Sequence, residues 1–287
     1  SGMNALEKQF GTRDIDTIKK KTGCESQKCI AALLPGDIAA RQLRRRFKIP
    51  GPTGVQLLSN FNIDGILEQM EDKFPWFYSF GFSMRNGSEF AYECEPNALG
   101  EKVLACDVIA RPDRANRIDC KSLIAAGKKA AATVINTDVY QRGGKHWMAL
   151  YIDLEIPRVE FFNSSGNAPC AEIINWMAAR CEELQKITSS SATSVRVSKI
   201  RHQHSRTECG VYSLFYIYAR LSGIPMEYFM ETPIPDQLMM EFRQHLFDDS
   251  GPNNLSTIDM SLARKYKLPE GKFSWDEFSR RVKIQWE

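Results

Sequence analysis

The residue best suited to nucleophilic chemistry is Cys209, in the stretch Thr207-Glu208-Cys209-Gly210. The residues that follow it are almost uniformly apolar, so the pattern predicts a buried helix over 209–221 that begins at the cysteine. The positive end of a helix dipole favours a thiolate, which predicts a lowered pKa for Cys209. The alternative is a structural thiol, because free cysteines are usually buried and inert.

His146 could act as the base for such a nucleophile. It precedes the apolar run 147–153, which predicts a central strand covered on both faces, and 159–163 predicts the next strand. A short turn between them pairs Met148 with Asn163, which makes His146 a diagonal neighbour of Asn163 on one sheet face. A carboxamide there can orient the imidazole toward a thiol, as in a Cys-His-Asn arrangement. The alternative is a structural histidine at the start of a strand.

Gln203 stands six residues before Cys209. A loop that curls into the start of the helix would bring its amide beside the thiol, and this amide with the Cys209 backbone N–H could form an oxyanion hole. His202 and His204 flank the glutamine, and two histidines in alternation could be metal ligands. No third ligand is evident, so the sequence predicts neither a metal site nor a cofactor.

The surrounding pattern predicts an α+β core. Helices are expected over 57–74 and 169–187, and further strands over 133–136 and 194–201. The second helix should turn one apolar face inward, formed by Ile173, Ile174, Met177, Cys181 and Leu184. Residues 75–130 show no clear pattern.

Asn62 and Asp64 stand near the start of the first expected helix. A capping role is favoured for both, since short polar side chains are typical of helix starts. The alternative places them near a substrate channel.

Composition and breakers set the domain organisation. The chain has 287 residues, of which 43% are hydrophobic and 25% charged, so it is globular and long enough for one large domain with an appendage. A Pro- and Gly-rich stretch at 49–54 predicts a boundary between a helical arm, residues 1–52, and a core, residues 53–247. The clearest helix of the arm is expected over 39–47. Residues 248–287 are expected to form a small helical extension, with a capping box at Ser274-Trp-Asp-Glu277.

Charge and cysteine usage restrict the partners. The net charge is only +3, but residues 1–52 hold 11 Lys and Arg against 5 Asp and Glu. This excess indicates either a solvated basic face or an anionic partner. No apolar run is long enough to span a membrane. The cysteines are widely spaced, and Cys24 and Cys29 have no nearby second pair or histidine for zinc, so we expect reduced thiols and a cytosolic protein.

Three stretches together resemble the SUMO-protease-like cysteine peptidases, a family that includes adenovirus-type proteases and is also called ubiquitin-like-protein-specific. They are Gly-Lys-His146-Trp147-Met-Ala-Leu-Tyr-Ile-Asp, Val-Glu-Phe-Phe-Asn163-Ser-Ser and Gln203-His-Ser-Arg-Thr-Glu-Cys209-Gly-Val-Tyr-Ser-Leu. Asn163 stands where cellular members have Asp and is similar to the viral subgroup. The resemblance covers roughly residues 20–247 and leaves the C-terminal extension without a counterpart.

The resemblance implies a papain-related fold, a central mixed sheet flanked by helices, and a thiol protease. It implies His146, Asn163 and Cys209 as the catalytic residues, with Gln203 and the Cys209 N–H in the oxyanion hole. For the viral subgroup it implies processing of structural polyproteins after Gly-Gly during virion maturation, in the host cytoplasm at virus assembly sites and in the virion. The alternatives are an isopeptidase acting on host SUMO-like conjugates, an acyltransferase, or an inactive binding module.

Trp147 and Asn136 are the candidate substrate-binding residues. An indole beside the base could cover a narrow tunnel, and a narrow cleft favours glycine because it has no Cβ. For Trp147 the alternative is core packing. Asn136, at the end of the expected strand 133–136, could bind substrate backbone or satisfy the end of that strand.

Overall fold

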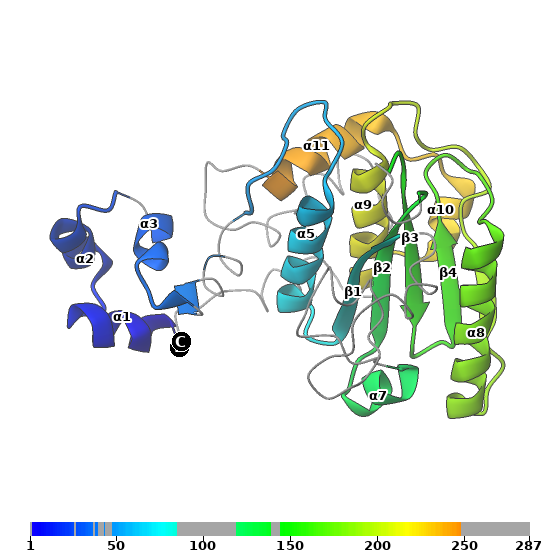
Figure 1. Ribbon diagram of the computed structural model, residues 1–287, viewed down its shortest axis with the longest axis horizontal. Coiled ribbons are helices and arrows are strands. Elements are labelled where there is room, and N and C mark those ends of the chain that lie inside the picture. Colours follow the sequence, from blue (N-terminus) through cyan, green and yellow to red (C-terminus); the bar gives the residue numbers. More distant parts are fainter. Residues whose placement is uncertain are drawn as a thin grey trace.

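The computed structural model describes residues 2–25, 27–36, 38, 39, 43, 48–84, 119–138 and 144–247 (Figure 1). Its centre is a five-stranded sheet in the order β1-β2-β3-β4-β5. The strands are β1 (Phe77–Met84), β2 (Ala130–Asn136), β3 (Trp147–Asp153), β4 (Arg158–Phe162) and β5 (Thr193–Arg196). The two inner pairings are antiparallel and the two outer ones parallel, so the sheet is mixed and the α+β expectation is confirmed.

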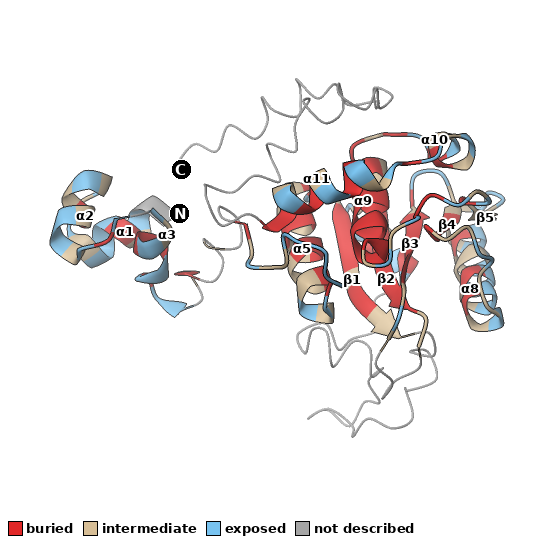
Figure 2. Ribbon diagram, turned by 90° about the horizontal axis from the view of Figure 1, so that it is seen from above, coloured by how far each residue is buried: buried red, intermediate tan, exposed pale blue. Residues whose placement is uncertain are grey.

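Helices cover both faces of this sheet. The helices of the described residues are α1 (Gly2–Phe10), α2 (Ile15–Thr22), α3 (Gln27–Ala32), α5 (Asn60–Lys73), α7 (Cys120–Ala125), α8 (Ala171–Thr188), α9 (Cys209–Leu221), α10 (Met226–Glu231) and α11 (Asp236–Phe247), of which α1, α2 and α3 do not pack on the sheet. Side chains of α5, α9 and α11 share a core with one face of the sheet, and those of α7 and α8 share a core with the other. Figure 2 shows α9 as the most deeply buried helix; it packs on the sheet beside α5, and α11 packs against it.

Strand β2 shows how one strand contributes to both cores. Ala132 and Val134 pack into the cluster on the α9 side, whereas Ala131 and Ile135 pack into the cluster on the α8 side. Successive side chains of a strand point to opposite faces, so a strand covered on both faces must be apolar throughout. Small and β-branched residues meet this requirement over most of β2, which is buried along its length.

The hairpin of β3 and β4 has the predicted register. Ala149 pairs with Phe162 and Leu150 with Phe161. The same register sets Met148 opposite Asn163, which is the pairing expected from the sequence. The predicted bounds of α9, residues 209–221, are also confirmed.

Other elements differ from the expectation at their ends. The helix expected over 57–74 begins at Asn60, because Ser59 and Asn62 form a reciprocal capping box: each side chain accepts the other's backbone N–H. The strand expected over 194–201 ends at Arg196. β1 and α7 lie in the stretch 75–130, where the sequence shows no clear pattern.

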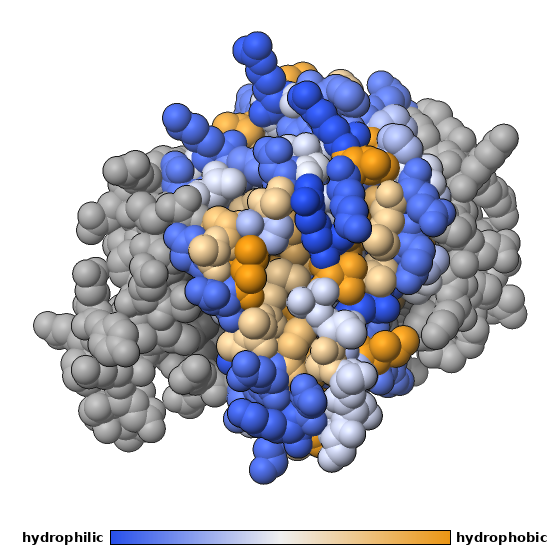
Figure 3. Space-filling view, turned by 90° about the vertical axis from the view of Figure 1, so that its right-hand side faces the viewer, coloured by the Kyte–Doolittle hydropathy of each residue, from blue (hydrophilic) through white to orange (hydrophobic). Residues whose placement is uncertain are grey.

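Helix α8 covers one face of the sheet with a narrower apolar stripe than predicted. Ile173, Met177 and Leu184 are buried, but Ile174 is 51% exposed, so its assignment to the inner face was wrong. On this side of the molecule, hydrophilic residues surround a less polar central area (Figure 3). Among the described residues, no helix has both the length and the apolar character needed to cross a lipid bilayer.

The N-terminal helices α1, α2 and α3 have a hydrophobic cluster of their own. Its buried members are Leu6, Ile18, Cys24, Ile30, Leu34 and Ala39. Figure 1 shows these helices grouped apart from the sheet. The helix expected over 39–47 and the capping box at 274–277 fall largely or wholly outside the described residues. The domain bounds at 52 and 247, and the anionic partner of the arm, stay predictions.

Cys24 and Cys29 form a disulfide, so the expectation of reduced cysteines throughout was wrong for this pair. Gly23 ends α2 in a left-handed conformation, φ 72°, and the chain then turns back into α3, which brings the two cysteines together. The free cysteines among the described residues are Cys120, Cys170, Cys181 and Cys209.

The end of the arm, residues 48–52, is fixed on α11. Lys48 Nζ donates to the Gln244 carbonyl at 3.3 Å, and Arg243 donates to the Pro52 carbonyl at 3.3 Å. A Cβ on Gly51 would lie 2.2 Å from the Phe247 ring, so this close approach requires glycine. The predicted boundary is therefore docked on the core.

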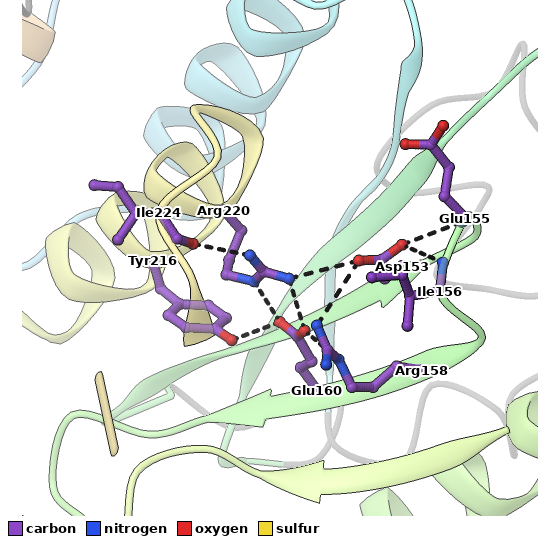
Figure 4. A network of polar contacts seen from close by, with 8 residues as sticks. All are labelled: Asp153, Glu155, Ile156, Arg158, Glu160, Tyr216, Arg220 and Ile224. Carbon is purple, nitrogen blue, oxygen red and sulfur yellow. Dashed lines mark hydrogen bonds and ion pairs between the residues drawn. The ribbon is translucent and has the colours of Figure 1, made fainter. Parts of the chain in front are cut away.

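A buried ionic network ties α9 to the sheet (Figure 4). Glu160 of β4 has no exposed surface, and its carboxylate accepts from Arg220 at 2.8 and 2.9 Å and from the Tyr216 hydroxyl at 2.6 Å. Arg158 Nε donates to the same carboxylate at 2.9 Å, and Asp153 lies 3.6 Å from Arg220. A buried charge is tolerated only with such partners, so the network holds α9 at one position along β4.

Candidate active site

Cys209 is the first residue of α9, and its sulfur faces the start of β3. The backbone N–H groups of Trp147, Gly210 and Cys209 itself are near enough to the sulfur to favour its thiolate. The thiol is therefore next to the residue that follows His146. Packing of α9 on β3, through the shared core on that side of the sheet, produces this proximity.

Burial reverses the expected acidity of Cys209. The residue is 1% exposed, and loss of hydration raises the pKa of its thiol because the charged thiolate is disfavoured. The three backbone N–H groups act in the opposite direction, and the neighbouring Glu208 carboxylate raises the pKa further. The prediction of a lowered pKa was therefore wrong, since desolvation outweighs the helix terminus.

His146 and Asn163 are in contact as the register predicted: His146 Nε2 lies 2.7 Å from Asn163 Oδ1. Asn163 Nδ2 donates to the Asn167 carbonyl at 3.3 Å, which fixes Oδ1 as the acceptor. His146 Nε2 therefore carries the hydrogen in the neutral imidazole. The lone pair is left on Nδ1, where it can accept a proton.

Asn163 is itself held by two serines that the sequence analysis missed. Ser165 donates to Asn163 Oδ1 through its N–H at 3.1 Å and its hydroxyl at 2.8 Å. The buried Ser198 hydroxyl accepts the Asn163 N–H at 2.8 Å and donates to the Asn163 carbonyl at 2.6 Å. The Asn-Ser-Ser sequence is a local turn signal that could have found Ser165. Ser198 reaches the site only through the fold.

Gln203 is buried on the loop between β5 and α9, with its amide fixed at both ends. Its Oε1 accepts from the Ser164 hydroxyl at 2.7 Å, and its Nε2 donates to the Ser205 carbonyl at 3.1 Å. An amide nitrogen has two hydrogens, so one donor of Nε2 is left for another acceptor. The Gln203 N–H also donates to the Ser164 carbonyl at 2.9 Å, which joins this loop to the end of β4.

Trp147 packs between the loop before α5 and the start of α9. Its indole Nε1 donates to the Leu58 carbonyl at 3.0 Å, and its ring meets Phe82 edge-on at 6.2 Å between centroids. A Cβ on Gly210 would lie 3.2 Å from both Leu58 and Trp147. These contacts are those of core packing beside the thiol, and a role in covering substrate stays a prediction.

Asn136 supports the connection between β2 and β3. Its Oδ1 accepts from the Asp138 N–H at 3.0 Å, and its side chain fills the space beside Gly144, which has φ +57°. Asn136 pairs with Trp147 in the sheet, so it lies one residue from His146. The contacts are those expected of a residue that satisfies the end of a strand, and substrate binding stays a prediction.

The other polar candidates have separate positions. Asn62 belongs to the capping box of α5, as favoured, whereas Asp64 accepts from the Phe82 N–H at 2.7 Å and joins α5 to β1. His202 is buried and its Nδ1 accepts from the Ile234 N–H at 3.1 Å, whereas His204 is exposed. The two histidines therefore do not share a site.

Comparison with known proteins places this chain in a family. Residues 91–253 match the Ulp1 protease family, C-terminal catalytic domain. A cysteine protease of African swine fever virus (isolate Tick/Malawi/Lil 20-1/1983) is 35% identical over 241 residues, covering 80% of this chain and 85% of the relative.

Two further comparisons agree. A protein of the Pig/Kenya/KEN-50/1950 isolate of the same virus, named a SUMO-1 cysteine protease, is 36% identical over 246 residues, covering 80% of this chain and 85% of the relative. The crystal structure of the protease of African swine fever virus superposes with a TM-score of 0.59 at 32% identity, covering 87% of this chain and 92% of that one. The chain therefore belongs to the Ulp1 protease family and is a cysteine protease.

Proposed function

We propose that Cys209 is the nucleophile, His146 the general base and acid, and Asn163 the residue that orients the imidazole. Gln203 Nε2 and the Cys209 N–H form the oxyanion hole. The observation that carries the proposal is the 2.7 Å contact of His146 Nε2 with Asn163 Oδ1, one residue before Trp147, whose ring borders Gly210 at the start of α9, next to Cys209. The order of the groups, orienting amide to imidazole to thiol, is that of a Cys-His-Asn protease.

These contacts indicate which group holds the proton at each step of the reaction. Burial raises the pKa of Cys209, so the resting thiol keeps its proton until His146 Nδ1 accepts it during attack on the peptide carbonyl. The carbonyl oxygen becomes an oxyanion, held by Gln203 Nε2 and the Cys209 N–H. His146 then gives the proton to the leaving amine, and water hydrolyses the thioester. Asn163 is neutral, so it orients the imidazolium but supplies no negative charge to stabilise it.

For substrate we propose a viral structural polyprotein, cleaved after Gly-Gly during virion maturation at assembly sites in the host cytoplasm and in the virion. The support is the resemblance of the stretches around His146, Asn163 and Cys209 to the viral subgroup, together with the 35% identity over 241 residues to a cysteine protease of African swine fever virus. Trp147 would cover these glycines, and Asn136 would contact the substrate backbone.

A second candidate is removal of SUMO-like proteins from their conjugates. It is favoured by the name of one viral relative, a SUMO-1 cysteine protease. Both candidates require attack on the carbonyl of the second of two glycines, so the site alone does not separate them. They differ in whether a folded ubiquitin-like protein must dock outside the cleft.

The test incubates the purified protein with Gly-Gly-Xaa peptides and, separately, with a folded SUMO precursor, and locates each new N-terminus by mass spectrometry. The Cys209→Ser variant should cut neither. The matched control is Cys181→Ser, which removes a half-buried thiol of α8 and should cut at the normal rate.

Cys209-dependent cleavage of the peptides, with the SUMO precursor spared, supports polyprotein processing. Cleavage of the SUMO precursor alone would transfer the assignment to deconjugation. No cleavage of either substrate by the unsubstituted protein would contradict both and favour an acyltransferase on the same thiol.

A further inference from the structure

The loop 202–208 carries one proposed oxyanion donor and leads directly into the other. An oxyanion hole lowers the barrier only when its donors are already in place, and a displacement of about 1 Å can cost about 10²-fold in rate. Because this loop is neither helix nor strand, its position must be set by contacts from other elements.

Asp236, the first residue of α11, binds this loop through both carboxylate oxygens. Oδ2 accepts from the Ser205 N–H at 2.8 Å and from the His204 N–H at 3.1 Å. Oδ1 accepts from the Tyr212 hydroxyl at 2.9 Å and lies 3.3 Å from the His204 nitrogen. Two consecutive backbone amides of the loop therefore share one carboxylate.

Ser205 connects that carboxylate to Gln203. The Ser205 N–H donates to Asp236, and the Ser205 carbonyl accepts from Gln203 Nε2 at 3.1 Å. Gln203 is held on its other side by Ser164, which donates to Oε1 at 2.7 Å. The direction of the second Gln203 Nε2 hydrogen therefore depends on the position of Ser205.

Tyr212 places the same carboxylate relative to α9. Its hydroxyl lies 2.9 Å from Asp236 Oδ1 and 2.8 Å from the Ile234 carbonyl, two acceptors that share its one hydrogen, and the tyrosine is on the first turn of the helix that begins with Cys209. Asp236 is thus joined to both parts of the oxyanion hole, to Gln203 through Ser205 and to the start of α9 through Tyr212.

We propose that Asp236 is a positioning residue for the oxyanion hole, which fixes the Gln203 amide through Ser205. The inference rests on the proposed role of Gln203. A carboxylate suits this position because the groups that bond it, two backbone N–H groups and a hydroxyl, are all donors. An asparagine would offer one oxygen and would point its own N–H groups at a backbone N–H.

The test compares Asp236→Asn with Gln203→Ala, with the double variant, and with Glu231→Gln as a control that removes an exposed carboxylate of α10. Loss of an oxyanion donor costs about 10²-fold in kcat, so we expect that fall for Gln203→Ala and about tenfold for Asp236→Asn, with KM little changed. The double variant should be no slower than Gln203→Ala, because both changes remove the same interaction.

Two further measurements separate positioning from general loss of structure. A peptide aldehyde forms a tetrahedral adduct with an oxyanion, so its affinity should fall with kcat in Asp236→Asn. Alkylation of Cys209 by iodoacetamide forms no oxyanion, so its rate should be unchanged. Tyr212→Phe removes one donor to Asp236 and should show a smaller fall in kcat of the same kind.

A normal kcat in Asp236→Asn, beside a slow Gln203→Ala, would overturn the inference and leave the proposed function standing. A normal kcat in Gln203→Ala would remove Gln203 from the mechanism and the inference with it. A parallel fall of kcat, alkylation rate and thermal midpoint in both Asp236→Asn and Tyr212→Phe would mean that Asp236 serves the fold in general, and would also overturn it.

Discussion

The candidate active site is assembled from two kinds of structure. His146 and Asn163, the strand half, flank the hairpin of β3 and β4, and their contact follows from the register of two neighbouring strands. Gln203 and Cys209, the loop half, stand on a loop and at the start of a helix. Their positions depend on Asp236 and Arg243 of α11, which are distant in sequence.

The difference teaches where precision comes from in each half. A strand pair sets its side chains by the period of the sheet, with every backbone bond adding to the same register. The loop half has no such ladder and is fixed by single polar contacts. Arg243, for example, donates to the Thr207 carbonyl at 3.1 Å and lies 3.4 Å from Glu208, next to the nucleophile. Single substitutions should therefore affect the two halves differently.

The largest effect is expected from loss of the base in the strand half. His146→Ala should lower kcat by about 10³-fold or more, because general acid–base catalysis contributes up to about 10⁴-fold. Burial raises the pKa of Cys209, so its alkylation in this variant should be slow at neutral pH and accelerate as pH rises. The exposed His204→Ala is the control, and activity of His146→Ala within tenfold of the unsubstituted protein, a range of about 1.4 kcal/mol, would exclude this role.

The next largest effect is expected from the buried ionic network of Glu160, which joins β4 of the strand half to α9 of the loop half. Glu160→Ala leaves Arg220 buried without its main partner, so the free energy of unfolding should fall by about 3–5 kcal/mol in urea denaturation. Glu155→Ala removes an exposed ion pair with Lys129 and should cost less than about 1 kcal/mol. Equal costs for the two variants would show that the buried network adds nothing special.

A pH effect is expected from the loop half. Burial lowers the pKa of His202 to about 4, so the folded protein keeps this imidazole neutral. The unfolded chain takes up the proton as pH falls through about 6.5, so stability is full above that pH and declines below it, by up to about 3 kcal/mol near pH 4. Urea denaturation across this range should show the slope in the unsubstituted protein and a much smaller one in His202→Asn. Equal slopes would assign the acid sensitivity to other groups.

The smallest effect is expected at Gly166, beside Asn163. Substitution there separates the steric cost of a Cβ from the conformational cost of a positive φ. Gly166 and Gly127 both have positive φ, but a Cβ on Gly166 would lie 2.8 Å from the Ile200 carbonyl, whereas Gly127 faces open space. Gly166→Ala should therefore cost about 1–2 kcal/mol more than Gly127→Ala in denaturation. The kcat of Gly166→Ala should also fall, because a shift of residue 166 displaces its N–H, which donates to the Asn163 carbonyl at 2.9 Å. Equal costs would place no steric demand at Gly166.

The same division explains what the sequence could predict. The strand half was accessible because alternation and a short turn set the register that brings Asn163 to His146. The bounds of α9 were accessible because its apolar run ends in clear breakers. Asp236, Arg243 and Ser198 were not accessible, since nothing local links them to the loop or the asparagine that they hold. The acidity of Cys209 was predicted with the wrong sign because the helix terminus is visible in sequence, whereas burial against β3 is a tertiary property.

The most direct test of the account is a crystal structure of the protein with a Gly-Gly peptide aldehyde. Both halves should meet at one carbon atom, bonded to the Cys209 sulfur. Its oxygen should lie about 2.7–3.1 Å from Gln203 Nε2 and from the Cys209 nitrogen, with His146 Nδ1 facing the sulfur. An adduct on another cysteine, or an oxygen directed away from Gln203, would contradict the account.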